Sequence, residues 1–436
     1  MQVKKGSATP MQQMLNPNVR GLTQSATLAI NERSNALRRE GQTIYKFGLG
    51  QSPFPVPTEV VNTLRLYAHE KDYLPVKGLP ALREAVADFH RRKDHVEAQP
   101  DGVLVAPGSK ELLFLLQLVF DGELIVPTPC WVSYVPQARI LGRRVHLIHT
   151  TFVDKWRLMP YQIETLYKRN GPQPRILMLN YPGNPEGATY NAAELEELAA
   201  VARRAGIVLL SDEIYGQLHH EGKHVSVARF YPEGTIISSG LSKWCGAGGW
   251  RLGTFTFPAS LQWLLEAMAA VASETYTSVS APIQYAAVRA FRGAISIERY
   301  LWHARRILAA LGQRCAHLLS HAGVRVHPPI GAFYLFLDFS PLTAQLSRHG
   351  IQGSVTLCEH LLKETGVALL PGASCHRPAE ELTARLAYVN FDGAKALAAS
   401  ETLPLDQPLP EDFIDFWCED TVAGVQCLVD WLCAQR

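Results

Sequence analysis

The stretch Ser238–Gly253, "SSGLSKWCGAGGWRLG", holds one lysine, Lys243, and one arginine, Arg251, in a run otherwise rich in small, hydroxylated and glycine residues. The residues just before it, Thr235–Ser239, read as a short strand after the turn-forming "PEG". The glycines beyond the lysine permit close approach of the backbone to a bound molecule. Most lysines are ordinary solvated side chains, but one delivered into such a loop is a candidate for covalent bonding to a carbonyl group.

Composition places the chain among globular proteins. It has 436 residues, of which 47% are hydrophobic and 19% charged, enough for two sizeable cores, and its net charge of +2 gives no sign of a nucleic-acid surface. Its eight cysteines show no CxxC pair or zinc-like clustering, and the polar N-terminus lacks an apolar leader. The longest apolar run, Leu112–Phe120, is too short to span a bilayer. We therefore expect a cytoplasmic protein without a metal, a membrane partner or a nucleic-acid partner.

Seven short apolar runs alternate with helix-length amphipathic segments. This alternation predicts an α/β domain with a mostly parallel seven-stranded sheet flanked by helices, and ligands in such sheets bind at the carboxyl ends of the strands. The predicted strands cover residues 103–106, 124–126, 145–149, 176–179, 207–210, 235–239 and 254–257.

After about residue 260 the pattern changes to long helices, followed by short strands at "VRVH" and "AFYLFLDF" and a helix near Ser354–Thr365. This predicts a second, smaller α+β domain. The first fifty or so residues, with one helix near Thr27–Arg39, are too few to fold alone and are expected to join it. We place an N-terminal arm and part of the small domain at 1–55, a large domain at 56–300 and the small C-terminal domain at 301–436.

Two loops that follow predicted strands are suited to a planar, phosphorylated ligand. In "APGSKELLFLL", Gly108, Ser109 and Lys110 open an apolar helix whose free N–H groups can bind a phosphate, although any serine N-cap looks similar. In "PTPCWVSY", Trp131 follows a strand end, where its ring can cover a flat heterocycle or simply pack in the core.

Two further strand ends carry polar side chains. The turn "NYPGNPEG" places the amide of Asn184 at the sheet edge, where it can donate to a phenolic oxygen. The stretch "SDEIY" offers Asp212 and Tyr215. Because a carboxylate at the end of a buried strand needs a cationic partner, Asp212 is suited to a protonated ring nitrogen.

Taken together, these pieces resemble the class I/II aminotransferases, the fold-type-I pyridoxal 5'-phosphate (PLP) enzymes of the aspartate aminotransferase superfamily, from about Tyr45 to about Asn390. The specific matches are "SKWCGAGGWRLG" for S-K-x-x-x-x-x-G-x-R-x-G, "NYPGNPEG" for N-x-x-x-N-P-[TS]-G and "SDEIY" for D-x-x-Y. Weaker matches are "FGLGQSPFPVP", "DYLPVKGLPALREAV", "PGSKELL", "PCWVSY" and "ARLAY".

The resemblance implies a catalytic core of three residues. Lys243 would be the Schiff-base lysine and would move the proton between the substrate α-carbon and the cofactor. Asp212 would keep the pyridine nitrogen protonated, so that the ring acts as an electron sink. Tyr215 and Asn184 would hydrogen-bond the ring 3-oxygen, and Trp131 would stack on the ring.

The resemblance also implies the residues that hold the two ends of the bound molecules. The substrate carboxylate would be bound by Arg385 with the backbone of Gly50, so that the substrate-binding set is Gly50, Trp131, Asn184 and Arg385. Tyr73 would come from the neighbouring subunit of a homodimer with shared active sites. The phosphate-binding set would be Gly108, Ser109, Lys110, Ser242, Arg251 and Tyr73.

The chain departs from the family pattern at three places. Gly240 stands where many members carry a hydroxyl residue, so one phosphate contact is missing. Glu186 replaces the usual Thr or Ser and adds a carboxylate near the site mouth. The segment 391–412 is longer than the minimal pattern and rich in Pro, Asp and Glu. These departures bear on substrate identity rather than on proton transfer.

Transamination between an L-amino acid and a 2-oxo acid is the first interpretation. The alternative is a PLP enzyme of the same fold that catalyses elimination, cyclisation or oxidation, because the fold does not fix the fate of the carbanion. A DNA-binding sensor is disfavoured by the short N-terminal head. The amino donor stays open, with Arg20, Arg289 and Arg292 as candidates for a second carboxylate, and the pair His317 and His321 reads as a solvated helix face.

Overall fold

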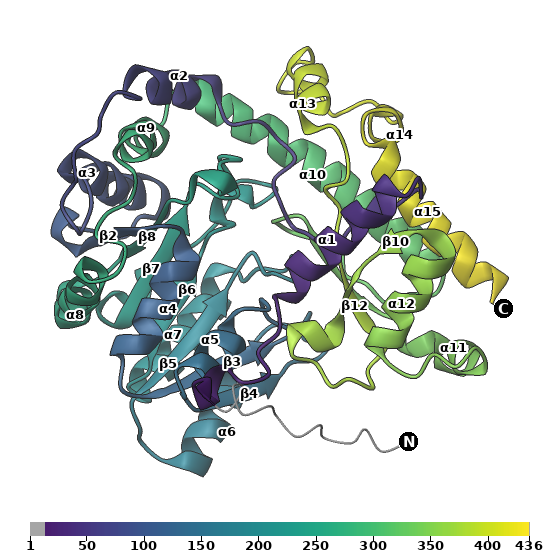
Figure 1. The fold of residues 1–436 in the computed structure, drawn as a ribbon, viewed down its shortest axis with the longest axis horizontal. Helices are drawn as coiled ribbons and strands as arrows, with labels where there is room; N and C mark the ends of the chain where they lie inside the picture. The colour runs from purple at the N-terminus through teal and green to yellow at the C-terminus, as the bar shows by residue number, and fades with distance from the viewer. Residues whose placement is uncertain (1–13, 436) are drawn as a thin grey trace.

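A seven-stranded sheet forms the centre of the larger part of the molecule (Figure 1). The computed structural model describes residues 14–435. The strand order is β2-β8-β7-β6-β5-β3-β4, and every neighbouring pair is parallel except those that β8 makes with β2 and β7. The predicted mostly parallel sheet is therefore confirmed. Its strands are β2 (Val103–Ala106), β3 (Glu123–Thr128), β4 (Val145–His149), β5 (Arg175–Asn180), β6 (Val208–Asp212), β7 (Thr235–Gly240) and β8 (Gly253–Thr256).

Helices cover both faces of this sheet, which explains why its central strands are continuous apolar runs. In β5, Ile176 and Met178 pack into one buried cluster with α4, α5 and α8, whereas Leu177 and Leu179 pack into another with α6 and α7. The period of two along the strand separates these two cores. The helices are α2 (Thr58–Leu66), α3 (Pro80–Phe89), α4 (Ser109–Val119), α5 (Tyr134–Ile140), α6 (Pro160–Asn170), α7 (Ala192–Arg204), α8 (Gln262–Ser273) and α9 (Ala281–Arg292).

The antiparallel strand β8 determines where the Lys243 loop lies. Antiparallel neighbours need no helical crossover, so the chain returns from β7 to β8 through residues 241–252 alone. This loop stays at the carboxyl edge of β7. Register places Asn180, Asp212 and Ser238 side by side at that edge.

The second part of the molecule is α+β, as predicted. Its sheet has the order β11-β12-β9, all antiparallel, and a separate parallel pair joins β1 to β10. The strand expected at "VRVH" is wrong, because that segment makes only an isolated bridge between Arg325 and Asp338. The strands are β1 (Tyr45–Lys46), β9 (Tyr334–Asp338), β10 (Val367–Ala368), β11 (Leu370–Pro371) and β12 (Thr383–Ala387), and the helices are α11 (Thr343–Arg348), α12 (Ser354–Thr365), α13 (Gly393–Glu401), α14 (Phe413–Trp417) and α15 (Glu419–Ala434).

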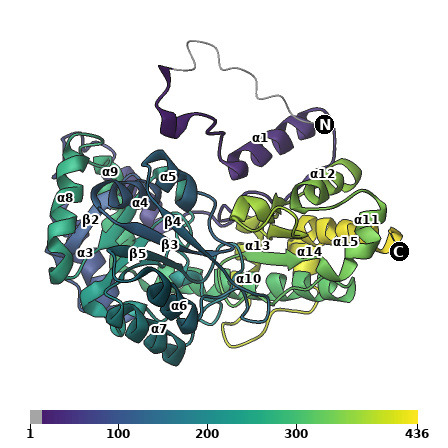
Figure 2. The same cartoon turned by 90° about the horizontal axis from the view of Figure 1, so that it is seen from below.

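Two helices link these parts. Helix α1 (Ala26–Arg39) lies across their junction in both views (Figures 1 and 2). Helix α10 (Ile295–His321) packs against α13 and α15. We propose the domain division expected from the sequence, with boundaries at residues 55 and 300; the second boundary falls inside α10.

Candidate active site

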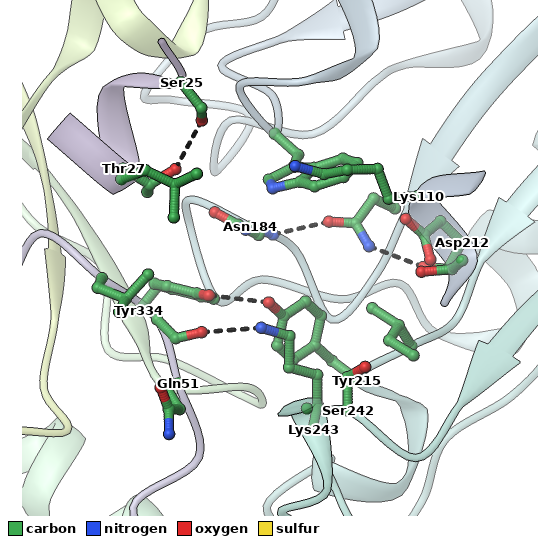
Figure 3. A pocket seen from close by; sticks show the side chains of 18 of the residues that line it. Ser25, Thr27, Gln51, Lys110, Asn184, Asp212, Tyr215, Ser242, Lys243 and Tyr334 are labelled. Carbon is green, nitrogen blue, oxygen red and sulfur yellow. Dashed lines mark hydrogen bonds between the residues drawn. The ribbon is translucent and has the colours of Figure 1, made fainter. Parts of the chain in front are cut away.

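A pocket of about 520 Å³ lies at the carboxyl ends of the parallel strands and extends to the small sheet and the start of α1 (Figure 3). Strand ends supply Asn180 and Asp212, the β7–β8 loop supplies Lys243, and β9 and β12 supply Tyr334 and Arg385. The pocket is therefore built from segments that are far apart in the sequence and that the two parts of the molecule bring together.

Lys243 lies at the centre of this pocket, where its side chain is half-buried. Its Nζ donates to the carbonyl oxygen of Gly50 at 2.8 Å and lies 5.5 Å from the centre of the Tyr215 ring (Figure 3). Burial first, and then the positive charge of Arg385, lowers the pKa of the Lys243 amine to about 8. The neutral, nucleophilic form of this amine is therefore far more populated near neutral pH than that of an ordinary lysine, although the charged form still predominates.

Asp212 is the carboxylate of the pocket, and it is 5% exposed. The hydroxyl of Tyr134 donates to its Oδ2 at 2.6 Å and that of Ser238 to its Oδ1 at 3.2 Å. Burial raises the pKa of this carboxyl, although these two hydrogen bonds and the charge of Lys243 oppose the shift. A cationic partner in the pocket would stabilise the charged form of such a buried carboxylate.

Arg385 is only 1% exposed and has no carboxylate partner among residues 14–435. It donates from Nη1 to Asn184 Oδ1 at 2.9 Å and from Nη2 to the carbonyl oxygen of Gly48 at 2.6 Å, while its buried Nε has no partner. Asn184 is held in turn because its N–H donates to Asn180 Oδ1 at 2.8 Å. This guanidinium can therefore bind an anion, to which its free Nε–H would donate.

Tyr215 and Tyr334 complete the buried wall beneath Lys243. Their hydroxyls are 2.8 Å apart and hydrogen-bonded (Figure 3). A Cβ atom at Gly50 would overlap the Tyr334 ring, so only glycine lets the backbone pass this close.

The opposite end of the pocket is positively charged. Arg251 has a left-handed backbone (φ 55°) and donates to the carbonyl oxygens of Gly248 at 2.8 Å and Pro107 at 3.3 Å. A Cβ atom at Gly108 would overlap the Arg251 guanidinium, so this arginine packs on the start of α4. Burial and the charge of Arg251 lower the pKa of Lys110, whose Nζ lies 5.1 Å from the centre of the Trp131 ring. Positive groups and the free N–H groups of a helix start thus converge here.

The structure brings most of the expected site residues together. The expected residues that line the pocket are Gly50, Ser109, Lys110, Trp131, Asn184, Asp212, Tyr215, Ser242, Lys243, Arg251 and Arg385. Gly108 lies beside it, against Arg251. Tyr73 does not line the pocket of its own chain, and it is 91% exposed.

Several pocket residues escaped the sequence analysis. Asn180 lines the pocket, and Tyr134 lies outside it but donates to Asp212; they belong to the stretches "NYPGNPEG" and "PCWVSY", in which the sequence assigned roles only to Asn184 and Trp131. Tyr334 lies in a strand that was predicted, without any local pattern to indicate a role. Ser25 and Thr27 reach the pocket from the start of α1 (Figure 3).

Two sets of charged residues lie elsewhere than the sequence suggested. Glu186 does not line the main pocket; it lines a separate small cavity behind Asn184, together with Cys130 and Tyr190. Arg20, Arg289 and Arg292 do not line the pocket either. Arg289 pairs instead with Glu59. All eight cysteines are free thiols.

Fold and pocket together define an enzyme with a central lysine opposite an aspartate at the edge of an α/β sheet. Residues 42–391 match the family described as Aminotransferase class I and II. The chain therefore belongs to this family: it is an aminotransferase, which acts on amino acids and 2-oxo acids, and the family uses pyridoxal phosphate. The resemblance seen in the sequence is confirmed.

Named relatives agree with this assignment. An aspartate/prephenate aminotransferase from Thermus thermophilus is 33% identical over 369 residues, which cover 82% of this chain and 90% of that protein. An aspartate aminotransferase from Geobacillus stearothermophilus is 31% identical over 398 residues, covering 89% and 96%. The structure of a Thermus thermophilus aspartate aminotransferase with maleate superimposes with a TM-score of 0.81 at 29% identity, covering 95% of this chain and 99% of the other.

Among residues 14–435, no helix combines the length and the apolar character needed to cross a bilayer.

Proposed function

We propose that the chain binds pyridoxal 5'-phosphate in this pocket at Lys243 and moves an amino group from an L-amino acid to a 2-oxo acid. One observation carries the proposal: a half-buried lysine with a pKa lowered to about 8 lies near a buried aspartate, in a pocket whose other cations lack anionic partners. Within residues 14–435, no ion pair joins Lys110, Arg251 or Arg385 to a carboxylate.

The donor set fits the cofactor at both ends. Among the described residues that line the pocket, Asp212 is the single carboxylate, and it shares the space with four cations, Lys110, Lys243, Arg251 and Arg385. A phosphate group carries a charge of about −1.5 to −2 and three acceptor oxygens, which would satisfy Arg251, Ser242 and the first N–H groups of α4. Asp212 would pair with a protonated pyridine nitrogen, and its burial strengthens that pairing.

Each side chain then has a definable task. Pyridoxal phosphate supplies, when bound, an electron-withdrawing ring that stabilises negative charge on the substrate α-carbon. The neutral amine of Lys243 would accept the α-proton and return it. The hydroxyl of Tyr215 and the amide of Asn184 would orient the ring oxygen, Trp131 would cover the ring, and Arg385 would bind the α-carboxylate through its unpartnered Nε side.

We also propose an amino donor with an acidic side chain. The Lys110 ammonium lines the pocket without an anionic partner, facing the same space as the hydroxyls of Ser25 and Thr27, which are 3.0 Å apart. A second carboxylate on the substrate would pair with Lys110 there. This agrees with the named relatives, which are aspartate aminotransferases.

Two measurements test the function. Borohydride reduction of the protein loaded with pyridoxal phosphate, followed by peptide mapping, is expected to place the cofactor mass on the peptide that contains Lys243. Label on another lysine, or no uptake, would disprove the site. In single-turnover reactions, aspartate or glutamate should each yield one 2-oxo acid per site, faster than alanine. Release of ammonia or uptake of oxygen would instead favour elimination or oxidation.

A further inference from the structure

A second cluster of chemically active side chains lies outside the pocket, around the residue that follows Asp212. It is formed by Asp94, Glu213 and His224, and one ligand atom from each lies within 4.8 Å of the others. The three residues come from separate segments: the π-helical turn His90–Asp94 at the end of α3, the end of β6, and the loop that follows. None of them lines the aminotransferase pocket.

Both carboxylates are held firmly by neighbouring groups. Glu213 Oε1 accepts from Ser211 at 2.7 Å, Ser226 at 2.6 Å and Tyr181 at 3.3 Å. Glu213 Oε2 is bonded only to His224 Nε2, at 2.8 Å. One oxygen is thus saturated by hydroxyls, and the other faces the cluster.

Asp94 is oriented in a similar way by His90, whose Nδ1 lies 2.7 Å from Asp94 Oδ2. In metal centres, the side chains that bind the metal are commonly oriented by a hydrogen bond to a further side chain. The side chains of the cluster and of His90 are at most 5% exposed, so their charges are little screened by solvent.

Side chains alone leave the cluster incomplete. Within the part of the chain that the structure describes, the buried atoms His90 Nε2 and His224 Nδ1 have no hydrogen-bond partner. Both histidines, together with Asp94 and Glu213, are among the residues that line a cavity of about 10 Å³. That volume is roughly one probe sphere, enough for a single ion or water.

We propose that Asp94, Glu213 and His224 bind a divalent transition-metal ion, with His90 as the positioning residue for Asp94. Two carboxylates balance the charge of a dication, and a mixed oxygen and imidazole donor set is suited to Zn²⁺ or Mn²⁺ rather than to a soft Cu⁺ ion. The competing arrangement is two buried ion pairs, His90 with Asp94 and His224 with Glu213, and no metal.

The site has a structural role. It joins the end of α3 to the end of β6, one residue beyond Asp212, so a bound ion would stabilise the edge of the sheet without contacting substrate. The sequence predicted no metal site, because the ligands are spread over three segments and form no short motif. This inference does not depend on the proposed function.

Crystals of the cofactor-loaded protein grown with Mn²⁺ or Zn²⁺ should show an anomalous peak between the three ligands. Calorimetric titration of chelator-treated protein with each ion should show one saturable site per chain and a concentration-dependent rise in melting temperature. Asp94→Asn should abolish this binding, and His90→Phe should weaken it about tenfold or more.

The double variant His317→Gln/His321→Gln is the matched control, since that pair lies on the exposed face of α10 and would account for adventitious binding by imidazoles. It should leave the titration unchanged. A parent protein with no anomalous peak and no saturable binding, or binding that persists in folded Asp94→Asn, would overturn the proposal in favour of plain ion pairs. The anomalous peak in the parent protein decides the matter even if Asp94→Asn does not fold.

Discussion

Arg385 combines nearly complete burial with an unpartnered Nε, which is costly unless an anion occupies the pocket. We expect Arg385→Lys to keep the charge and lose the planar fork. Losing one charge-assisted hydrogen bond costs roughly 1.5–3 kcal/mol, or about one to two powers of ten in kcat/KM for the amino acid.

Steady-state kinetics with a series of amino acids measure this loss. Arg377→Lys is a matched control, because Arg377 is also largely buried but pairs with Glu381 outside the pocket. Affinity for pyridoxal phosphate should hardly change in Arg385→Lys. A variant that loses the cofactor instead would assign Arg385 to the phosphate end or to the fold.

At Glu186, burial makes the stability of the fold depend on pH. Its carboxyl group lies in the small cavity behind Asn184, and burial raises the pKa of that carboxyl to about 8. The unfolded chain ionises near the ordinary value of about 4.3, so between that pH and about 8 unfolding releases a proton and stability falls as the pH rises. The contribution of the neutral Glu186 carboxyl to the folding stability is complete at acidic pH and is lost above pH 8.

Glu186→Gln removes this titration while keeping the shape. We expect the melting temperature of the variant to exceed that of the parent above pH 8, and the difference to vanish near pH 4. Thermal melts across this range provide the measurement. A difference that is independent of pH would mean that the pKa of this carboxyl is the same in the folded and the unfolded chain.

At the scale of elements, the pair β7–β8 fixes the lysine loop through close backbone contact. Gly240 faces Gly253 in this pair, and a Cβ atom at Gly240 would lie 2.7 Å from the Leu252 carbonyl oxygen. Close packing therefore explains why Gly240 stands where many family members carry a hydroxyl residue. The strands approach too closely for a side chain.

Gly240→Ser should destabilise the protein by about 1–3 kcal/mol, the usual cost of overpacking. It should not tighten binding of pyridoxal phosphate, since the backbone must shift to admit the side chain. Gly249→Ser is the control for the stability measurement, because a Cβ atom at Gly249 meets nothing within 4 Å. Denaturant titration and cofactor titration compare them, and tighter cofactor binding by Gly240→Ser would contradict this account.

Sequence patterns predicted most of this sheet because local chemistry decides it. Buried strands such as β5 are apolar on both faces, and Lys243, Asp212 and Asn184 stand in recognisable motifs at strand ends. Tyr334 was missed because its role arises only when β9 is brought against Tyr215. Similarly, the segment at 324–327 has strand composition, yet it bridges Asp338 at one residue only. Long-range packing decides such cases.

At the scale of the whole molecule, the start of α1, the small sheet and the ends of the parallel strands all line the pocket, so a substrate would lie between the two parts of the chain. Figure 2 shows these two parts side by side, with α1 above them. Ser25 and Thr27 come from one side and Lys110 from the other. Specificity for the amino donor would therefore depend on how these parts meet. This explains why no single stretch of sequence indicated the donor.

We propose that the working unit is a homodimer with shared sites, in which Tyr73 binds the phosphate in the partner's pocket. Tyr73 precedes β2, lies outside its own pocket and is 91% exposed, which leaves little packing in its own chain. Complementation tests this. Lys243→Ala disables the site of its own chain, and Tyr73→Glu places a carboxylate that repels the phosphate of the site that it reaches.

Each variant homodimer should be nearly inactive. If Tyr73 acts across the interface, a mixed dimer carries both defects in one site, and the other site keeps an intact lysine and tyrosine. Differentially tagged, purified mixed dimers should then regain up to about half of the parental activity, because one of two equivalent sites is restored. If Tyr73 serves its own chain, each site keeps one defect and mixing restores nothing, which would exclude the shared site.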